Sequence, residues 1–153
     1  MLIVTQAVVD GPAKKFRRGR AAAASLIPTS TGAAVATTKV LPELEGRMEA
    51  LAIRAPVLDG AITDIVVHLA KEVSVETVNR ALAVASEGSL KGILGYSEEE
   101  LVSADILGDP HSGTVDALST RVVQGHVAKI LVWFDNEFGY SRRLLDATEL
   151  FSV

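Results

Sequence analysis

Four short apolar segments follow one another in the second half of the chain with only turns between them. They cover residues 92–96, 101–106, 114–123 and 127–134, and they are rich in Val, Ile and Leu. Short apolar runs bounded by turn residues are typical of strands. Strands joined by short turns pair antiparallel, because a parallel connection needs a crossover of about a dozen residues or more. We therefore predict an α+β fold, with a mixed, largely antiparallel sheet and helices on one face.

Two segments of helical periodicity accompany these strands. Residues 75–86 place apolar side chains on one face, with Ser74 at the N-cap position and Gly88 at the left-handed position after the helix. Residues 140–151 show the same periodicity. The first half of the chain predicts a strand at 2–9, a helix at 33–41 that Pro42 stops, and strands at 48–55 and 61–70. We expect residues 1–153 to form a single domain.

Charge and hydropathy exclude two classes of partner. The chain has 15 Lys and Arg against 19 Asp and Glu, and its net charge of −4 argues against general nucleic-acid binding. Its apolar runs are too short to span a bilayer, so we expect no membrane partner. We also expect a cytoplasmic location, with which the absence of cysteine is compatible. No G-x-G-x-x-G phrase follows the first predicted strand, so no dinucleotide site of that type is expected.

The chain contains no cysteine. This excludes disulfides, thiolate metal sites and thiol catalysis by the chain's own residues. The three histidines, His68, His111 and His126, have none of the spacings typical of metal ligands, so we expect no metal site.

Two features are candidates for binding an anion, and each has a simpler alternative. Thr31 and Gly32 stand at a predicted helix start, where free N–H groups and the helix dipole attract phosphate. Thr31 or Ser30 can equally serve only as a helix cap. Arg54 lies in an apolar strand and needs a partner, which is either an internal carboxylate such as Asp64 or a ligand anion.

Two further segments carry unusual side chains. Residues 14–20 hold five cations, including Arg18, and can form either a bidentate phosphate clamp or an ordinary basic surface loop. Residues 133–140 join the last strand to the last helix and combine aromatic rings with Asp135 and Asn136. Either Asp135 or Asn136 can cap the helix, and the segment as a whole fits core packing or recognition of an amide and a ring.

Eight phrases of the chain resemble the glyceraldehyde-3-phosphate dehydrogenase family in their order and spacing. They lie at residues 17–22, 27–34, 41–46, 52–56, 76–79, 90–96, 116–120 and 133–140. The likeness is to the C-terminal, catalytic domain of that family, from about residue 17 to the end and more loosely from residue 1. Erythrose-4-phosphate dehydrogenases share many of these phrases.

The resemblance implies roles for six residues. Thr31 and Gly32 correspond to the family's inorganic-phosphate site, and Arg54 to the arginine that holds the substrate phosphate. Arg18 corresponds to the phosphate-site arginine of the Arg-Arg-x-Arg phrase. After the last predicted strand, Asn136 and Tyr140 correspond to the family's residues that contact the nicotinamide of NAD or NADP. Asn136 corresponds to the residue that hydrogen-bonds its carboxamide, and Tyr140 to the aromatic residue near its ring.

The chain also departs from the family pattern. The family's histidine base follows a Met-x-x-Val phrase, and that position here holds Thr5. The segment before Arg17 is about five residues shorter than the pattern, and Val8 takes the place of a phosphate-binding threonine. The nucleophilic cysteine and the Rossmann domain are not found in the chain, so we expect no catalytic residue and no bound cofactor for the isolated chain.

Three functions fit these observations. The first is a non-catalytic module that forms homo-oligomers through a face of its sheet and binds phosphate or a sugar phosphate. The second is a subunit of a split aldehyde-phosphate dehydrogenase, completed by a partner chain that carries the Rossmann domain and the cysteine. The third is a gene remnant without a selected function.

Overall fold

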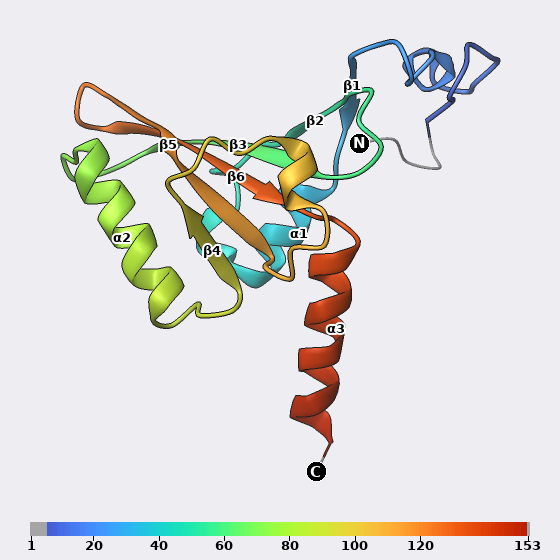
Figure 1. Cartoon of the computed structure of the whole chain (residues 1–153). Helices are drawn as coiled ribbons and strands as arrows, with labels where there is room; N and C mark the ends of the chain where they lie inside the picture. The colour runs from blue at the N-terminus through green and yellow to red at the C-terminus, as the bar shows by residue number, and fades with distance from the viewer. Residues whose placement is uncertain (1–5, 153) are drawn as a thin grey trace. The chain divides into compact units, whose positions relative to one another are not determined.

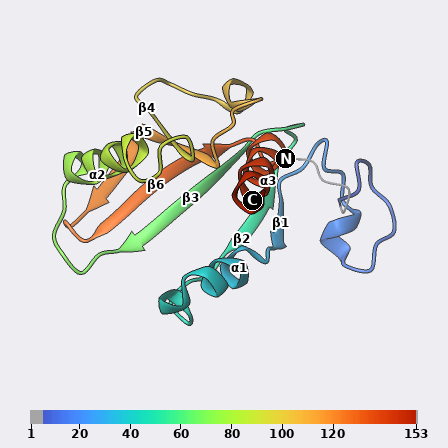
Figure 2. The same ribbon diagram turned by 90° about the horizontal axis from the view of Figure 1, so that it is seen from below.

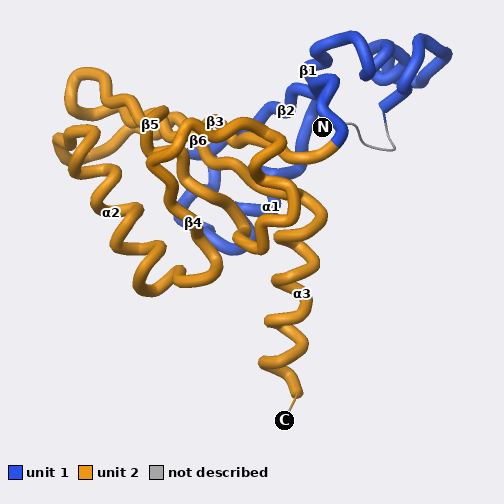
Figure 3. Tube along the Cα trace, in the orientation of Figure 1, with its two compact units in different colours: residues 1–58 blue, residues 59–153 orange. Residues whose placement is uncertain are grey.

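The computed structural model describes residues 6–152, and the chain forms two compact units, residues 1–58 and 59–153 (Figure 3). The division falls between the two strands predicted at 48–55 and 61–70. The expectation that residues 1–153 form a single domain stays a prediction.

The first unit is built around a short antiparallel ribbon. Strand β1 pairs with β2 from Ile27 opposite Arg54 to Ser30 opposite Leu51. Helix α1 follows β1, and Pro42 opens a short 3-10 turn just after it, as the sequence predicts. The elements of this unit are η1 (Phe16–Gly19), β1 (Ile27–Ser30), α1 (Ala33–Val40), η2 (Pro42–Leu44) and β2 (Leu51–Arg54).

The predicted strand at 2–9 is wrong for residues 6–9, and residues 2–5 lie outside the described part of the chain. The backbone of this segment bonds to a turn instead of to a strand. Ala7 donates its N–H to the Arg18 carbonyl at 3.1 Å and accepts from the Ala22 N–H at 2.9 Å. The segment therefore lines the turn at residues 16–20.

The second unit contains a four-stranded sheet in the order β3-β6-β5-β4 (Figure 1). Its three pairs are antiparallel, antiparallel and parallel, so the predicted α+β fold with a mixed, largely antiparallel sheet is confirmed. The strands are β3 (Ala61–His68), β4 (Leu94–Ser97), β5 (Gly113–Val123) and β6 (Val127–Phe134). A tight turn joins β5 to β6, in which Gln124 and Gly125 both have positive φ angles, of 50° and 69°, as a type I′ hairpin requires.

Two longer helices complete this unit. Helix α2 (Val75–Glu87) lies against β4 and β5 (Figures 1 and 2), and Asn79 donates to the Ala117 carbonyl at 3.0 Å. Helix α3 (Phe138–Phe151) follows β6 and runs away from the end of the sheet (Figure 1). The hydroxyl of Ser74 accepts from the Thr77 N–H at 3.2 Å, which confirms the predicted N-cap.

Two local predictions in this unit are wrong. Residues 101–106 do not form a strand but end in the 3-10 turn η3 (Ser103–Ile106). The Asp105 carboxylate accepts from the Val102 N–H at 2.8 Å, and this bond closes a tight turn that a strand cannot accommodate. Gly88 follows α2 with a φ of −108°, so the helix ends without a left-handed residue.

Candidate functional site

Arg18 and Arg54 lie near each other in the first unit. Arg18 belongs to the turn η1, Arg54 is the last residue of β2, and both side chains are half-buried. Burial lowers the pKa of Arg54, and the positive charge of Arg18 lowers it further. Within residues 6–152, the Nε atom of Arg54 is buried and has no hydrogen-bond partner.

Two guanidinium groups at close range repel each other unless an anion lies between them. The sequence left two partners open for Arg54, an internal carboxylate such as Asp64 or a ligand anion. The structure engages Asp64 elsewhere, because its carboxylate forms an ion pair with Lys129 at 2.8 Å across β3 and β6. Asp64 is therefore engaged with a cation of its own sheet.

Thr31 and Gly32 lie at the start of α1, at the opposite end of the β1–β2 ribbon from Arg54. Arg54 pairs with Ile27, three residues before Ser30, which corresponds to about 10 Å along a strand. The Thr31 hydroxyl accepts from the Ala33 N–H at 3.2 Å, and Gly32 has open space around its Cα. The four predicted residues therefore lie in two places, with Arg18 and Arg54 in one and Thr31 and Gly32 in the other.

Asn136 and Tyr140 lie in the second unit, at the junction of β6 and α3. The Asn136 side-chain amide donates to the Glu137 carboxylate at 3.2 Å. Its Oδ1 atom is buried and has no partner in the part of the chain that the structure describes. Tyr140 follows one helical turn later with 65% of its surface exposed, so an unpaired amide oxygen and an exposed ring share this junction.

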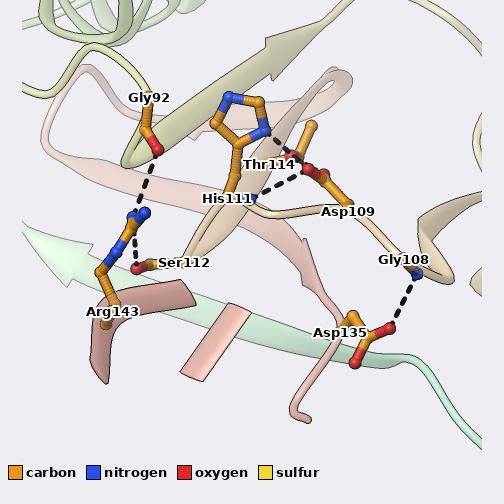
Figure 4. Close-up of polar contacts among 8 residues, drawn as sticks. All are labelled: Gly92, Gly108, Asp109, His111, Ser112, Thr114, Asp135 and Arg143. Atoms are coloured by element: carbon orange, nitrogen blue, oxygen red, sulfur yellow. Dashed lines mark hydrogen bonds and ion pairs between the residues drawn. The ribbon is translucent and has the colours of Figure 1, made fainter. Parts of the chain in front are cut away.

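Asp135 holds this junction in place. Its carboxylate accepts from the N–H groups of Glu137 at 2.9 Å and Phe138 at 2.8 Å. It also accepts from the Gly108 N–H at 2.8 Å (Figure 4). Burial acts to raise the pKa of Asp135, but these three donors together bring it below its ordinary value. Of the two caps that the sequence proposed for α3, Asp135 is therefore the one that bonds to the first N–H groups of the helix.

A second carboxylate orders the loop before β5. Asp109 accepts from the Nδ1 atom of His111 at 2.6 Å, from the His111 N–H at 3.0 Å and from the Thr114 hydroxyl at 2.7 Å (Figure 4). Arg143, on α3, donates to the Ser112 hydroxyl at 3.3 Å and to the Gly92 carbonyl at 3.2 Å. These contacts fix the loop and the start of α3 to the sheet. The Asp109-Pro110 turn phrase was the one sequence signal for them.

Gln6 has a role that the sequence did not reveal. Its side chain is 5% exposed, and its Nε2 atom donates to the carbonyls of Arg17 at 3.0 Å, Arg18 at 3.2 Å and Arg20 at 2.8 Å. A lone Gln beside an apolar segment carries no pattern that points to a turn more than ten residues away. Thr5, the residue at the family's base position, lies outside the described residues.

Residues 6–152 contain neither a cluster of metal ligands nor a membrane-spanning helix. No group of three or more His, Asp or Glu side chains there is arranged to hold a metal ion. His68 and His126 stack with their ring centroids 6.2 Å apart, and no third ligand joins them. None of the helices in the same range is long and apolar enough to cross a membrane.

Comparison with known proteins identifies relatives along almost the whole chain. The family model described as glyceraldehyde 3-phosphate dehydrogenase, C-terminal domain, matches residues 2–136. A glyceraldehyde-3-phosphate dehydrogenase of Priestia megaterium is 54% identical over 144 residues, 94% of this chain and 43% of the relative. One from Haloarcula vallismortis is 54% identical over 145 residues, 95% of this chain and 43% of the relative. Glyceraldehyde-3-phosphate dehydrogenase 1 of Candida glabrata is 48% identical over 149 residues, 97% of this chain and 45% of the relative. The chain thus spans less than half the length of these relatives.

Proposed function

Because this chain belongs to the glyceraldehyde 3-phosphate dehydrogenase family, as its C-terminal domain, we propose that it binds phosphate or a sugar phosphate through Arg18 and Arg54. In this proposal the chain acts as a phosphate-binding module without dehydrogenase activity of its own. It also forms homo-oligomers.

The single observation that carries the proposal is the pair of guanidinium groups in the first unit. Burial lowers the pKa of Arg54, the positive charge of Arg18 lowers it further, and the Arg54 Nε atom has no partner among residues 6–152. A phosphate group supplies both the negative charge and several acceptor oxygens, which match the fork of donors on an arginine. Thr31 and Gly32 are assigned to a second, separate phosphate position at the start of α1.

The absence of dehydrogenase activity is proposed on chemical grounds. Oxidation of an aldehyde by this family's route needs a thiolate nucleophile, a base and a bound nicotinamide. The chain has no cysteine, and Thr5 stands at the position that the sequence analysis assigned to the base. We therefore assign the chain binding of the phosphate without chemistry on the aldehyde.

The proposed homo-oligomer rests on an apolar surface of the second sheet. Ile62 and Val66 are 43% and 63% exposed on the edge strand β3. Side chains two residues apart on a strand point to the same face, so both lie on the face that also bears Asp64 and Lys129. An apolar strip on an edge strand is prone to pairing with another copy of the chain.

The proposal is tested by titrating the chain with inorganic phosphate in a calorimeter. Arg54→Ala is expected to weaken binding about 10- to 100-fold, because a charge-assisted hydrogen bond contributes about 1.5–3 kcal/mol. Arg47→Ala is the matched control, since Arg47 is an exposed cation of the same unit, and it should bind phosphate as the native chain does. A native chain that binds no phosphate, or equal losses in both variants, would refute the proposal.

A second candidate function is a split enzyme, which the junction of β6 and α3 favours. The buried, unpaired Oδ1 of Asn136 and the exposed ring of Tyr140 are suited to an amide-bearing ring such as nicotinamide. Apolar side chains on α3 are also exposed, with Leu144 at 51% and Phe151 at 86%. A partner chain with a Rossmann domain and the family's cysteine should then co-purify with this chain, and the Asn136→Ala variant of the complex should bind NAD more weakly. Failure of such a chain to bind would exclude this function.

A further inference from the structure

We propose that Gln6 is a positioning residue of the phosphate site, which holds the turn at residues 17–20 so that Arg18 stays beside Arg54. The proposal rests on the phosphate-binding function argued above. It assigns a role to a side chain that touches no ligand itself and that lies in a different segment from the two arginines.

The side-chain amide nitrogen of Gln6 donates to three backbone carbonyls. Its amide nitrogen lies 2.8–3.2 Å from the carbonyls of Arg17, Arg18 and Arg20. An amide nitrogen has only two protons, so these three carbonyls share them. The opposite orientation of the amide would place its oxygen against three carbonyl oxygens. The orientation of Gln6 is therefore fixed by the turn.

The oxygen of the Gln6 amide is buried in an unfavourable environment. Gln6 Oε1 is buried and without a hydrogen-bond partner among residues 6–152. A buried acceptor that loses its hydrogen bonds to water destabilises the folded chain. The three donor contacts on the nitrogen must offset this loss, so the turn is the reason for burying Gln6.

The turn depends on this support, because it supplies few contacts of its own. The 3-10 turn η1 has four residues, and no side chain caps its start at Lys15. The Arg17 carbonyl accepts from the Arg20 N–H at 3.4 Å, whereas no backbone N–H of residues 15–20 bonds to the carbonyls of Arg18 and Gly19. Segment 6–11 provides the partners instead, because Ala7 N–H bonds to Arg18 O at 3.1 Å and Gly11 N–H to Gly19 O at 2.8 Å.

Arg18 needs to be held because its neighbour repels it. Arg18 lies in the turn that the Gln6 amide bonds to, and burial together with the positive charge of Arg18 lowers the pKa of Arg54. A turn free to move would let Arg18 swing away from Arg54, and the site would have to restore that geometry each time phosphate bound. A rigid turn reduces this ordering cost, which raises affinity for the anion.

Asp10 offers a matched control on the other side of the same segment. Its carboxylate accepts from the Ala21 N–H at 2.8 Å and pairs with Arg20 Nε at 3.2 Å. Neither contact involves the carbonyl of Arg17 or Arg18. Asp10→Ala therefore loosens the segment without releasing the backbone of Arg18.

The experiment measures inorganic phosphate affinity by calorimetry for the full chain, with each variant kept well below its unfolding temperature. Gln6→Met keeps the size of the side chain and removes the donor, and it should weaken binding about tenfold. Asp10→Ala should change the affinity less than about twofold, within the spread expected for a surface contact. In an Arg18→Ala background, Gln6→Met should cause no additional loss, because its effect passes through Arg18.

The outcomes separate this role from the function on which it rests. If the native chain binds no phosphate, the phosphate-binding function fails and the role of Gln6 fails with it. If the native chain binds and Gln6→Met binds equally well, only the role of Gln6 is refuted. An equal loss from Gln6→Met in the Arg18→Ala background would also refute it, since Gln6 would then act on stability alone. Should Gln6→Met not fold, Gln6→Asn keeps the amide one methylene short of the carbonyls, and an unchanged affinity there refutes the role equally.

Discussion

The two units of the chain differ sharply in charge. Residues 1–58 contain eight Lys and Arg and four Asp and Glu, whereas residues 59–153 contain seven and fifteen. The acidic unit uses carboxylates to hold its own backbone, as the buried Asp135 and the half-buried Asp109 do. The basic unit instead holds Arg54 partly buried, and the positive charge of Arg18 acts on it.

A comparison of two arginines shows what this difference means. Arg143 and Arg54 both have a buried Nε atom without a partner in residues 6–152. Arg143 nevertheless has its charge balanced inside its own unit, by Asp146 at 2.7 Å. The charge that acts on Arg54 is that of Arg18, and it has the same sign. In the second unit the polar groups stabilise the fold, while in the first we propose that Arg18 and Arg54 bind an anion.

The largest effect is expected from breaking the strongest of these internal contacts. Asp135→Ala leaves three backbone N–H groups without their acceptor, and it should lower the free energy of unfolding by about 3 kcal/mol or more. This change can be measured by urea unfolding, monitored through the fluorescence of Trp133. Trp133 is the chain's one tryptophan and lies in the same unit as Asp135. Asp64→Ala breaks only an exposed ion pair and should cost less than about 1 kcal/mol. Equal effects would remove the distinction between buried and surface carboxylates.

Acid should affect the second unit through the same groups. Hydrogen bonds hold the pKa of Asp135, and that of Asp109, below the ordinary carboxyl value, against the opposing effect of burial. The stability that they contribute is therefore fully present above the unfolded carboxyl pKa of about 3.9 and is lost as the pH falls through the lower, folded pKa. Urea unfolding between pH 7 and pH 3 should show this loss, and Asp135→Asn should flatten the profile. A variant with the native pH dependence would contradict the assignment.

Phosphate should act on the other unit. At a concentration about 100 times the dissociation constant, a ligand that binds only the native state stabilises it by about 2.7 kcal/mol. Amide hydrogen exchange should slow around Arg18, Thr31 and Arg54 in residues 1–58, and it should stay unchanged around Asp135. Protection spread evenly over residues 6–152 would indicate a general effect of salt and would remove the contrast between the units.

The parts of the fold that the sequence predicted are those with strong local signals. The helix α2 has regular apolar spacing and a Ser74 cap, and the hairpin of β5 and β6 has long apolar strands around a Gly turn. The prediction of a strand at 101–106 was wrong because it rested on the apolar residues of the segment and did not take Asp105 into account. The Asp105 carboxylate that closes the turn acts through a hydrogen bond, which hydropathy does not measure.

The candidate site shows the same limit at longer range. The residues Arg18, Thr31 and Arg54 could be proposed from helix ends, apolar surroundings and family resemblance. The turn that carries Arg18 folds against residues 6–11, and the bond partners of Gln6 lie 11 to 14 positions away. Such contacts leave no periodic pattern in the sequence, so sequence reasoning had no means of finding them.

The smallest predicted effect compares the starts of two helices, one in each unit. In α2 the Ser74 hydroxyl caps the Thr77 N–H at 3.2 Å, so Ser74→Ala should cost about 1 kcal/mol of stability. In α1 the residue at the same position is Gly32, and the Thr31 hydroxyl reaches only the Ala33 N–H. Thr31→Ala should therefore cost less than Ser74→Ala in thermal unfolding but weaken phosphate binding, which Ser74→Ala should leave unchanged. The reverse pattern would mean that Thr31 is an ordinary cap and that the start of α1 binds no anion.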